Sequence, residues 1–249
     1  MSGHSKWHTI KHKKGAADAK RGKIFTRLIK ELTVAARNGG GDPDMNPRLR
    51  TIIADARAAN MPADNIKRAI RRGTGEEPGM SYDEVTYEGY GPGGVAIIVE
   101  TLTDNKNRTV GEMRHTFTKY GGNLGEANSV GWMFEKKGLV SIEKGKAEED
   151  ALMSAVLDAG ADDMKDDGSL WEIVSTPDVH AAVVEAVKKL GIEPDTAEIG
   201  MVPQNYIKLD SKQTQQLLKL LEALEDHDDT KNVWSNADID EKEIEASLA

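Results

Sequence analysis

The spacing of apolar residues changes near residue 75, and this change limits the chain to a helical part followed by a mixed part. In residues 24–36, 49–56 and 66–70 the apolar side chains recur every three or four positions, which is the period of an amphipathic helix. Residues 95–102 form a continuous apolar run typical of a buried strand. Residues 73–79 are rich in Gly and have no apolar period, so we place a domain boundary there.

Three short helices are expected in the first part. The first covers residues 24–36 and ends in the glycine-rich residues 38–41. Asn46 is a favourable cap for the second helix, with proline at the following position. The third begins at Pro62 and ends at Gly73. Their apolar stripes predict a small three-helix bundle.

The order of elements after residue 79 predicts the fold class. Residues 137–203 show the series βαββαβ of a ferredoxin-like fold, with strands at 139–142, 162–166, 170–174 and 192–201 and helices at 148–159 and 177–190. The segments before and after this series together supply the elements of a second fold of this kind. Their strands are expected at 82–87, 95–102, 129–135, 206–209 and 230–234, and their helices at 107–120 and 214–224.

We therefore expect an α+β protein with a helical N-terminal domain and two ferredoxin-like domains, the third inserted in the second. The predicted domains are residues 1–79, residues 80–136 with 204–249, and residues 137–203.

Charge is distributed unevenly between the two parts. Residues 1–79 hold 17 Lys and Arg against 8 Asp and Glu, a net charge of +9, whereas the whole chain carries −9, so residues 80–249 carry −18. Such an asymmetry indicates a polyanionic partner for the first part.

The basic residues of the first part fall into two groups. A basic arm free of acids before Asp18 interleaves cations with an aromatic ring and histidines, which suits phosphate contacts and base stacking: Lys6, Trp7, His8, Lys11, His12, Lys13 and Lys14. A basic ridge on the first helix projects within an arc of about 100° opposite the apolar stripe: Lys20, Lys23, Arg27, Lys30 and Arg37. Arg21 adjoins it. The alternative for the ridge is an ordinary solvated helix face.

Further cations belong to the predicted site. Arg48 and Arg50 flank Leu49. Lys106 and Arg108 follow a buried strand at the start of a helix, where donors can hold a phosphate. The alternative for this loop is a plain helix start capped by an Asn. A cluster of cations at 67–72 has an equally good explanation in the helix dipole.

Other chemistry finds little support. The chain has no Cys, which excludes thiol catalysis and cysteine metal sites. His4, His8 and His12 could share a helix face, but no carboxylate accompanies them. Residues 91–94 precede a strand and do not lead from a strand into a helix, so they fit neither a dinucleotide-binding loop nor a P-loop. We expect no enzyme activity, no cofactor, no metal and no small-molecule substrate.

No apolar run is long enough to span a membrane, and no secretory signal follows the basic start. A cytoplasmic location without a membrane partner is therefore expected.

Long motifs identify a family resemblance. They are GHSKW (3–7), DAKRGKIF (18–25), NPRLR (46–50), NMP (60–62), DNI (64–66), TDNKNRT (103–109) and GGNLG (121–125). With these motifs the chain resembles the YebC/PmpR family, which includes a mitochondrial translational activator of cytochrome c oxidase. Asn128 stands where the family commonly has Gly, and Asn tolerates the left-handed conformation.

The resemblance implies a three-domain α+β architecture and a regulatory role described in two ways. Bacterial members are labelled transcriptional regulators that bind DNA, and translation-linked members act on the ribosome. The leading hypothesis is therefore a DNA-binding regulator. A ribosome-associated factor contacting rRNA or tRNA is the alternative, and a protein-interaction adaptor is the third.

Overall fold

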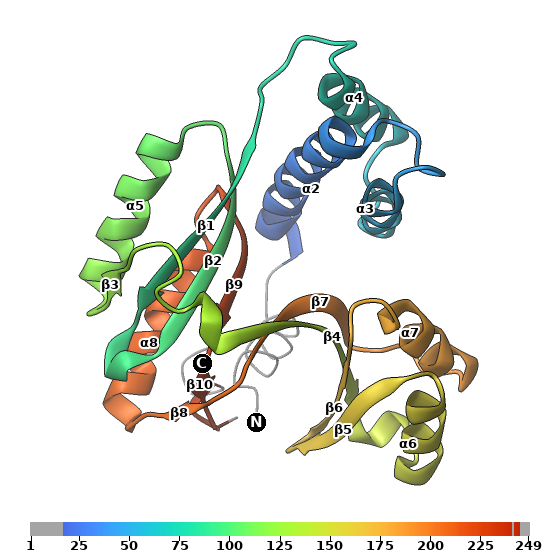
Figure 1. Cartoon of the computed structure of the whole chain (residues 1–249), viewed down its shortest axis with the longest axis vertical. Helices are drawn as coiled ribbons and strands as arrows, with labels where there is room; N and C mark the ends of the chain where they lie inside the picture. Colours follow the sequence, from blue (N-terminus) through green and yellow to red (C-terminus); the bar gives the residue numbers. More distant parts are fainter. Residues whose placement is uncertain (1–16, 241, 245–249) are drawn as a thin grey trace.

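The computed structural model describes residues 17–240 and 242–244, with side chains from residue 22 onward. Figure 1 shows its helical part at the upper right, a first sheet at the left and a second sheet at the lower right. Within the described residues, no helix combines the length and the apolar character needed to span a membrane.

The helical part consists of α2 (Ala17–Gly39), α3 (Pro47–Ala58) and α4 (Ala63–Thr74). Asn46 begins α3 because its Oδ1 accepts the N–H of Leu49 at 3.1 Å, and its amide also donates to the carbonyls of Ala35 and Gly40 at 2.9 Å each. The apolar stripes meet in a core that these helices make among themselves, with Leu32, Leu49 and Ile66 at its centre.

The first sheet has the order β3-β1-β2-β9, with antiparallel neighbours throughout. Its strands are β1 (Asp83–Tyr90), β2 (Ala96–Thr103), β3 (Asn123–Leu124) and β9 (Thr230–Ser235). Helices α5 (Lys106–Lys119) and α8 (Ser211–Glu225) cover one face (Figure 1). Phe117, Leu217 and Val233 are fully buried in the core between them and the sheet.

The second sheet has the order β5-β6-β4-β7 and is also antiparallel. Its strands are β4 (Phe134–Glu143), β5 (Ala161–Asp167), β6 (Leu170–Ser175) and β7 (Thr196–Pro203). Helices α6 (Glu149–Asp158) and α7 (His180–Lys189) pack on one face around Ile142, Leu152 and Val183. This is the βαββαβ series predicted between residues 137 and 203.

The α+β class with a helical N-terminal part is therefore confirmed. The strands of the second sheet are continuous in the chain, whereas those of the first come from both sides of them. The numerical domain boundaries stay a prediction. The two sheets meet through an apolar cluster that includes Ile98, Phe134, Val174 and Trp234.

The strand expected at 129–135 was wrong for most of its length. Residues Gly131–Met133 form a 3-10 turn, η2, and Phe134 begins a strand of the other sheet. The physical reason is Glu88, whose buried carboxylate accepts the N–H groups of Asn128, Val130 and Gly131 at 2.9, 2.7 and 2.7 Å. An N–H group that donates to this carboxylate cannot also form a hydrogen bond to a neighbouring strand. Asn128 has a φ of +66°, the conformation expected for it.

Two further elements differ from expectation. The strand expected at 206–209 shortens to β8 (Ile207–Lys208), which pairs with β10 (Ala237–Asp238) in a separate two-stranded sheet. Helix α2 begins at Ala17, seven residues before Ile24, the first residue of the predicted apolar stripe. Its extra first turns hold good helix formers such as Ala, Lys and Arg but no apolar period, so the pattern did not mark them.

Candidate nucleic-acid interface

The structure describes the side chains of only part of the predicted site. The basic arm lies outside the described residues, and Lys20 and Arg21 are described only as backbone of α2. The remaining predicted residues lie on α2, on α3 and at the start of α5: Lys23, Arg27, Lys30, Arg37, Arg48, Arg50, Lys106 and Arg108.

The basic ridge lies toward the first sheet, where Lys30 is buried while Lys23 and Arg27 remain exposed. The whole residue Lys30 is only 8% exposed, and Val34, which the helical period places inside the same arc, is 0% exposed. Helix α2 therefore has two buried sides, one toward α3 and α4 and one toward the sheet. The ridge was predicted from the cations that share this arc, and a single Val among them did not signal a packed face.

Lys30 is the most enclosed member of the ridge. Its Nζ donates to the carbonyl oxygens of Leu102 and Asp228 at 3.2 and 3.0 Å and to Oδ1 of Asp229 at 2.7 Å. All three partners belong to the first sheet or to the turn before β9. The ammonium group thus has three acceptors in place of water, which satisfies its three donors.

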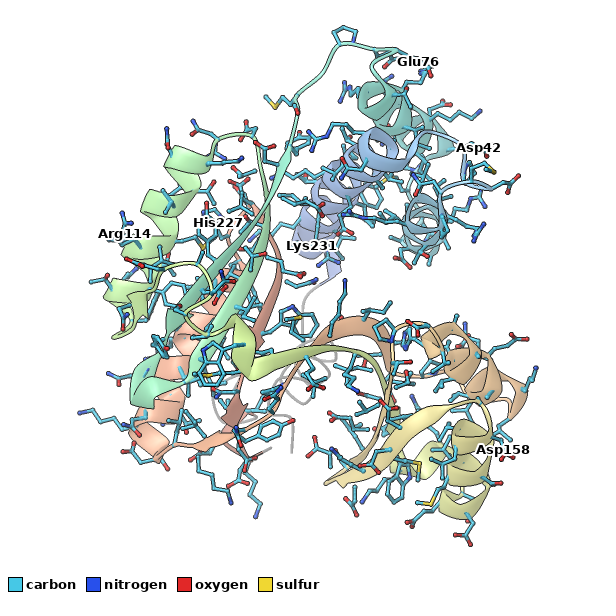
Figure 2. The ribbon with its side chains drawn as sticks, viewed as in Figure 1. Asp42, Glu76, Arg114, Asp158, His227 and Lys231 are labelled. Carbon is cyan, nitrogen blue, oxygen red and sulfur yellow. The ribbon has the colours of Figure 1, made fainter. Side chains whose placement is uncertain are left out.

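The neighbouring ridge cations contact the turn before β9 and the start of β9. Lys23 Nζ donates to the carbonyl oxygen of Asp226 at 3.0 Å and lies 3.4 Å from its Oδ1. Arg27 donates to the carbonyl oxygen of Lys231, which is labelled in Figure 2, at 3.4 Å and lies 3.5 Å from Glu31, one turn along α2. The acidic segment 226–229, which directly follows α8, was not part of the sequence-based site. Its run of Asp-His-Asp-Asp was the available signal.

A second contact between the helical part and the first sheet lies on α3. The Arg48 guanidinium binds both carboxylate oxygens of Glu84 on β1. The hydrogen bond from Arg48 holds the pKa of Glu84 below its ordinary value, although partial burial acts in the opposite direction. Arg37 Nη1 donates to Ser81 Oγ at 2.6 Å. These contacts place α3 and the end of α2 over the start of β1.

Asp229 is the centre of this polar network. Its side chain is only 4% exposed, and its oxygens accept from Lys30 at 2.7 Å, from Arg108 at 2.7 Å and from Thr109 at 2.8 Å. Burial by itself raises the pKa of Asp229, but the hydrogen bonds from these three residues hold the pKa well below its ordinary value. Asp229 is therefore a carboxylate that joins α2 to α5.

The loop before α5 forms a capped helix start. Asn105 Oδ1 accepts the N–H of Arg108 at 3.1 Å, as the capping alternative predicted. Arg108 lies 2.9 Å from Asp104, and Lys106 lies 3.3 Å from Asp83. The cationic groups that sequence reasoning assigned to phosphate are thus beside carboxylates in this structure.

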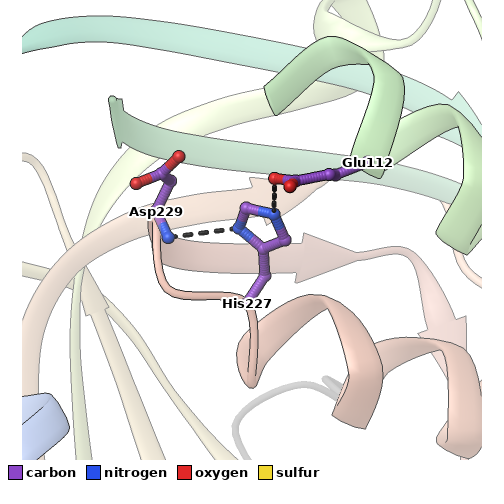
Figure 3. Close-up of side chains that lie close together, drawn as sticks. All are labelled: Glu112, His227 and Asp229. Carbon is purple, nitrogen blue, oxygen red and sulfur yellow. Dashed lines mark hydrogen bonds and ion pairs between the residues drawn. The ribbon is translucent and has the colours of Figure 1, made fainter. Parts of the chain in front are cut away.

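Figure 3 shows Glu112, His227 and Asp229 close together beside this network. The N–H of Asp229 donates to His227 Nδ1 at 3.1 Å, so the ring proton of the neutral imidazole lies on Nε2, which is 2.9 Å from Glu112. Both ring nitrogens are therefore used. Since Lys30 and Arg108 already neutralise Asp229, this group is poorly suited to a cation. It lines a hollow of about 500 Å³.

Other cations of the helical part remain free of acidic partners. Arg50 and Arg57 on α3 and Lys67 and Arg68 on α4 are exposed, and none forms an ion pair with a residue in the described ranges. The neighbouring Arg71 is paired with Glu77 at 2.7 Å. The helix dipole gives the α4 cations an alternative role, and they are not among the site residues predicted from the sequence.

The fold defines a class of protein: an α+β chain with a basic three-helix domain ahead of two ferredoxin-like sheets. Family models match residues 5–76 as the TACO1/YebC protein N-terminal domain and residues 82–237 as the TACO1/YebC second and third domain. The chain belongs to the TACO1/YebC family, as the sequence motifs indicated.

Relatives with known names extend over almost the whole chain. A "Probable transcriptional regulatory protein" of Koribacter versatilis is 65% identical over 98% of both chains. One of Geobacter sulfurreducens is 57% identical over 98% of this chain and 99% of its own. The crystal structure of a conserved hypothetical protein from Aquifex aeolicus has a TM-score of 0.80 and 44% identity, and covers 90% of this chain and 92% of its own.

Proposed function

We propose that this chain is a regulatory protein that binds nucleic acid, with DNA as the first candidate, through its helical part. Relatives carry the name of transcriptional regulatory proteins, and the first 79 residues have a charge of +9 within a chain of −9. A basic surface on an acidic protein favours a polyanion at one place and repels it elsewhere.

The observation that carries the proposal is the group of unpaired cations on the outer faces of α3 and α4. Arg50, Arg57, Lys67 and Arg68 are exposed and free of ion pairs within the described ranges. They contrast with the ridge cations, which contact the first sheet. In the closed arrangement seen here, α3 and α4 therefore provide the first phosphate contacts, and the basic arm extends the predicted surface.

RNA, on the ribosome or free, is the second candidate. Reading a DNA major groove requires several side chains at the start of one helix. The exposed cations here are instead divided between two helices, and those of α4 lie near its middle and not at its start. Backbone contacts of this kind fit duplex or structured RNA as well as DNA. An adaptor that binds an acidic protein is the third possibility. A cytoplasmic location and the lack of catalysis remain parts of the proposal.

The test compares the salt dependence of binding to a short duplex DNA and to a structured RNA. We expect Lys67→Glu with Arg68→Glu to lower the affinity about tenfold and to reduce the slope of log affinity against log salt by about two, one for each lost phosphate contact. The matched control is Lys188→Glu with Lys189→Glu, an exposed cation pair at the end of α7.

Equal losses in both variants, or none in either, would remove the α4 surface from the proposal. Binding with a shallow salt slope would favour the adaptor. Co-sedimentation with ribosomes on a gradient, lost on reversal of Lys11, Lys13 and Lys14 to Glu, would favour the RNA candidate. Capture of discrete DNA fragments without ribosome association would favour DNA.

A further inference from the structure

We propose that the acidic segment 226–229 is an internal substitute for a phosphate backbone, which occupies the basic ridge until nucleic acid displaces it. The ridge then becomes available only when the helical part separates from the first sheet. This inference rests on the proposed function and adds how its binding surface is regulated.

Charge complementarity is the first step of the argument. In each ion pair that the described residues form between the two parts, the cation belongs to the helices and the acid to the first sheet or the turn before β9: Lys23 with Asp226, Lys30 with Asp229 and Arg48 with Glu84. Lys23, Arg27 and Lys30 lie at positions i, i+4 and i+7, and so span about 10 Å along one helix face. Four consecutive phosphates of one duplex strand cover a similar distance along the axis, at about 3.4 Å for each step. The contact therefore has the chemistry of a cationic helix on an anionic backbone.

The weakness of this contact is the second step. The core of the helical part closes among α2, α3 and α4 and contains no residue of the sheets. The side chains of Lys23 and Asp226 are 55% and 60% exposed, and those of Arg48 and Glu84 are 39% and 41% exposed. Exposed ion pairs are screened by salt and add little to stability. Only the third pair, Lys30 with Asp229, is buried, with side chains 10% and 4% exposed. Domains joined by a polar interface of this kind are expected to move relative to one another.

The connection between the two parts is the third step. Among the described residues the chain passes only once from helices to sheet, between Thr74 and Asp83. Figure 1 shows this connection as a long extended segment above the rest of the molecule. It contains Gly75, which has a φ of +83°, as well as Pro78 and Gly79. The helical part can therefore swing away without unfolding either sheet.

The experiment measures opening and binding separately. Since the chain has no Cys, donor and acceptor dyes can be placed on Met45→Cys, next to α3, and Arg114→Cys, on α5, two exposed positions. The test variant combines Asp226→Lys with Glu84→Lys, which repels the helical part and leaves all its cations in place. We expect a longer dye separation than in the wild type, and binding of duplex DNA at least about threefold tighter than in the control.

The control combines Glu185→Lys with Glu193→Lys in the third domain, where the side chains are 69% and 81% exposed. It changes the net charge equally without touching the contact. Duplex DNA added to the wild type should lengthen the dye separation as well.

An unchanged separation in the test variant, or an affinity equal to that of the control, would overturn the inference. A longer separation in a protein that binds neither DNA nor RNA would support the ionic closure and contradict the proposed function.

Discussion

At the scale of single residues, Glu88 shows how one buried carboxylate decides the path of the chain. It accepts three backbone N–H groups of the loop that connects the two sheets. Trp132, in the same loop, is held by a bond from its Nε1 to the carbonyl of Ser129 at 3.2 Å and remains 67% exposed. The loop is thus ordered by polar contacts and not by burial of its aromatic ring.

We predict that Glu88→Gln lowers the free energy of unfolding by about 1.5–3 kcal/mol. The NH2 group of Gln is a donor, and it would face a backbone N–H group whose hydrogen bond the carboxylate oxygen accepts in the wild type. Chemical denaturation followed by Trp fluorescence measures the loss. Glu126→Gln is the control, since Glu126 lies in the same loop but is exposed. Equal stability of the two variants would show that the carboxylate is not required.

At the scale of elements, the packing of α4 on α2 depends on the absence of a side chain at Gly73. A Cβ there would lie 2.4 Å from the carbonyl oxygen of Thr33 and 2.7 Å from Cβ of Ala36. The two helices can approach this closely only with Gly at this position. The sequence predicted this residue as the end of the third helix, but the helix continues to Thr74 and its left-handed cap is Gly75.

Gly73→Ala is therefore expected to separate α4 from α2 and to destabilise the helical part by about 1–3 kcal/mol. Hydrogen exchange should accelerate in α2, α3 and α4 and stay unchanged in the second sheet. Gly111→Ala is the matched control, because an added Cβ meets nothing within 4 Å in α5. That change should slow exchange in α5, since Ala stabilises a helix by about 0.5–1 kcal/mol relative to Gly. The prediction fails if both variants behave alike.

At the scale of the whole molecule, the two joints between its parts differ in kind. The helical part meets the first sheet through ion pairs, whereas the two sheets meet through an apolar cluster. Trp234 in this cluster is 2% exposed, and a Cβ on Gly200 would lie 2.4 Å from its ring. Salt screens charges but does not weaken apolar contacts.

Raising the salt concentration should therefore lengthen the dye separation between Met45→Cys and Arg114→Cys. It should leave the separation between Leu157→Cys, an exposed position on α6, and Arg114→Cys unchanged. Gly200→Val is expected to change the second separation and spare the first. A parallel response of both pairs to salt would show that the joints do not differ as described.

The sequence by itself determined the helical first part, the βαββαβ series and the cap at Asn46, because periodicity and capping act over a few neighbouring residues. It also determined the opposite charges of the two parts. Only the tertiary structure decided where the ridge points, since a basic helix face has the same pattern whether it meets solvent, phosphate or an acidic turn distant in the chain. Asp226 and Asp229 lie about two hundred residues from Lys23 and Lys30, and no local rule connects positions so far apart.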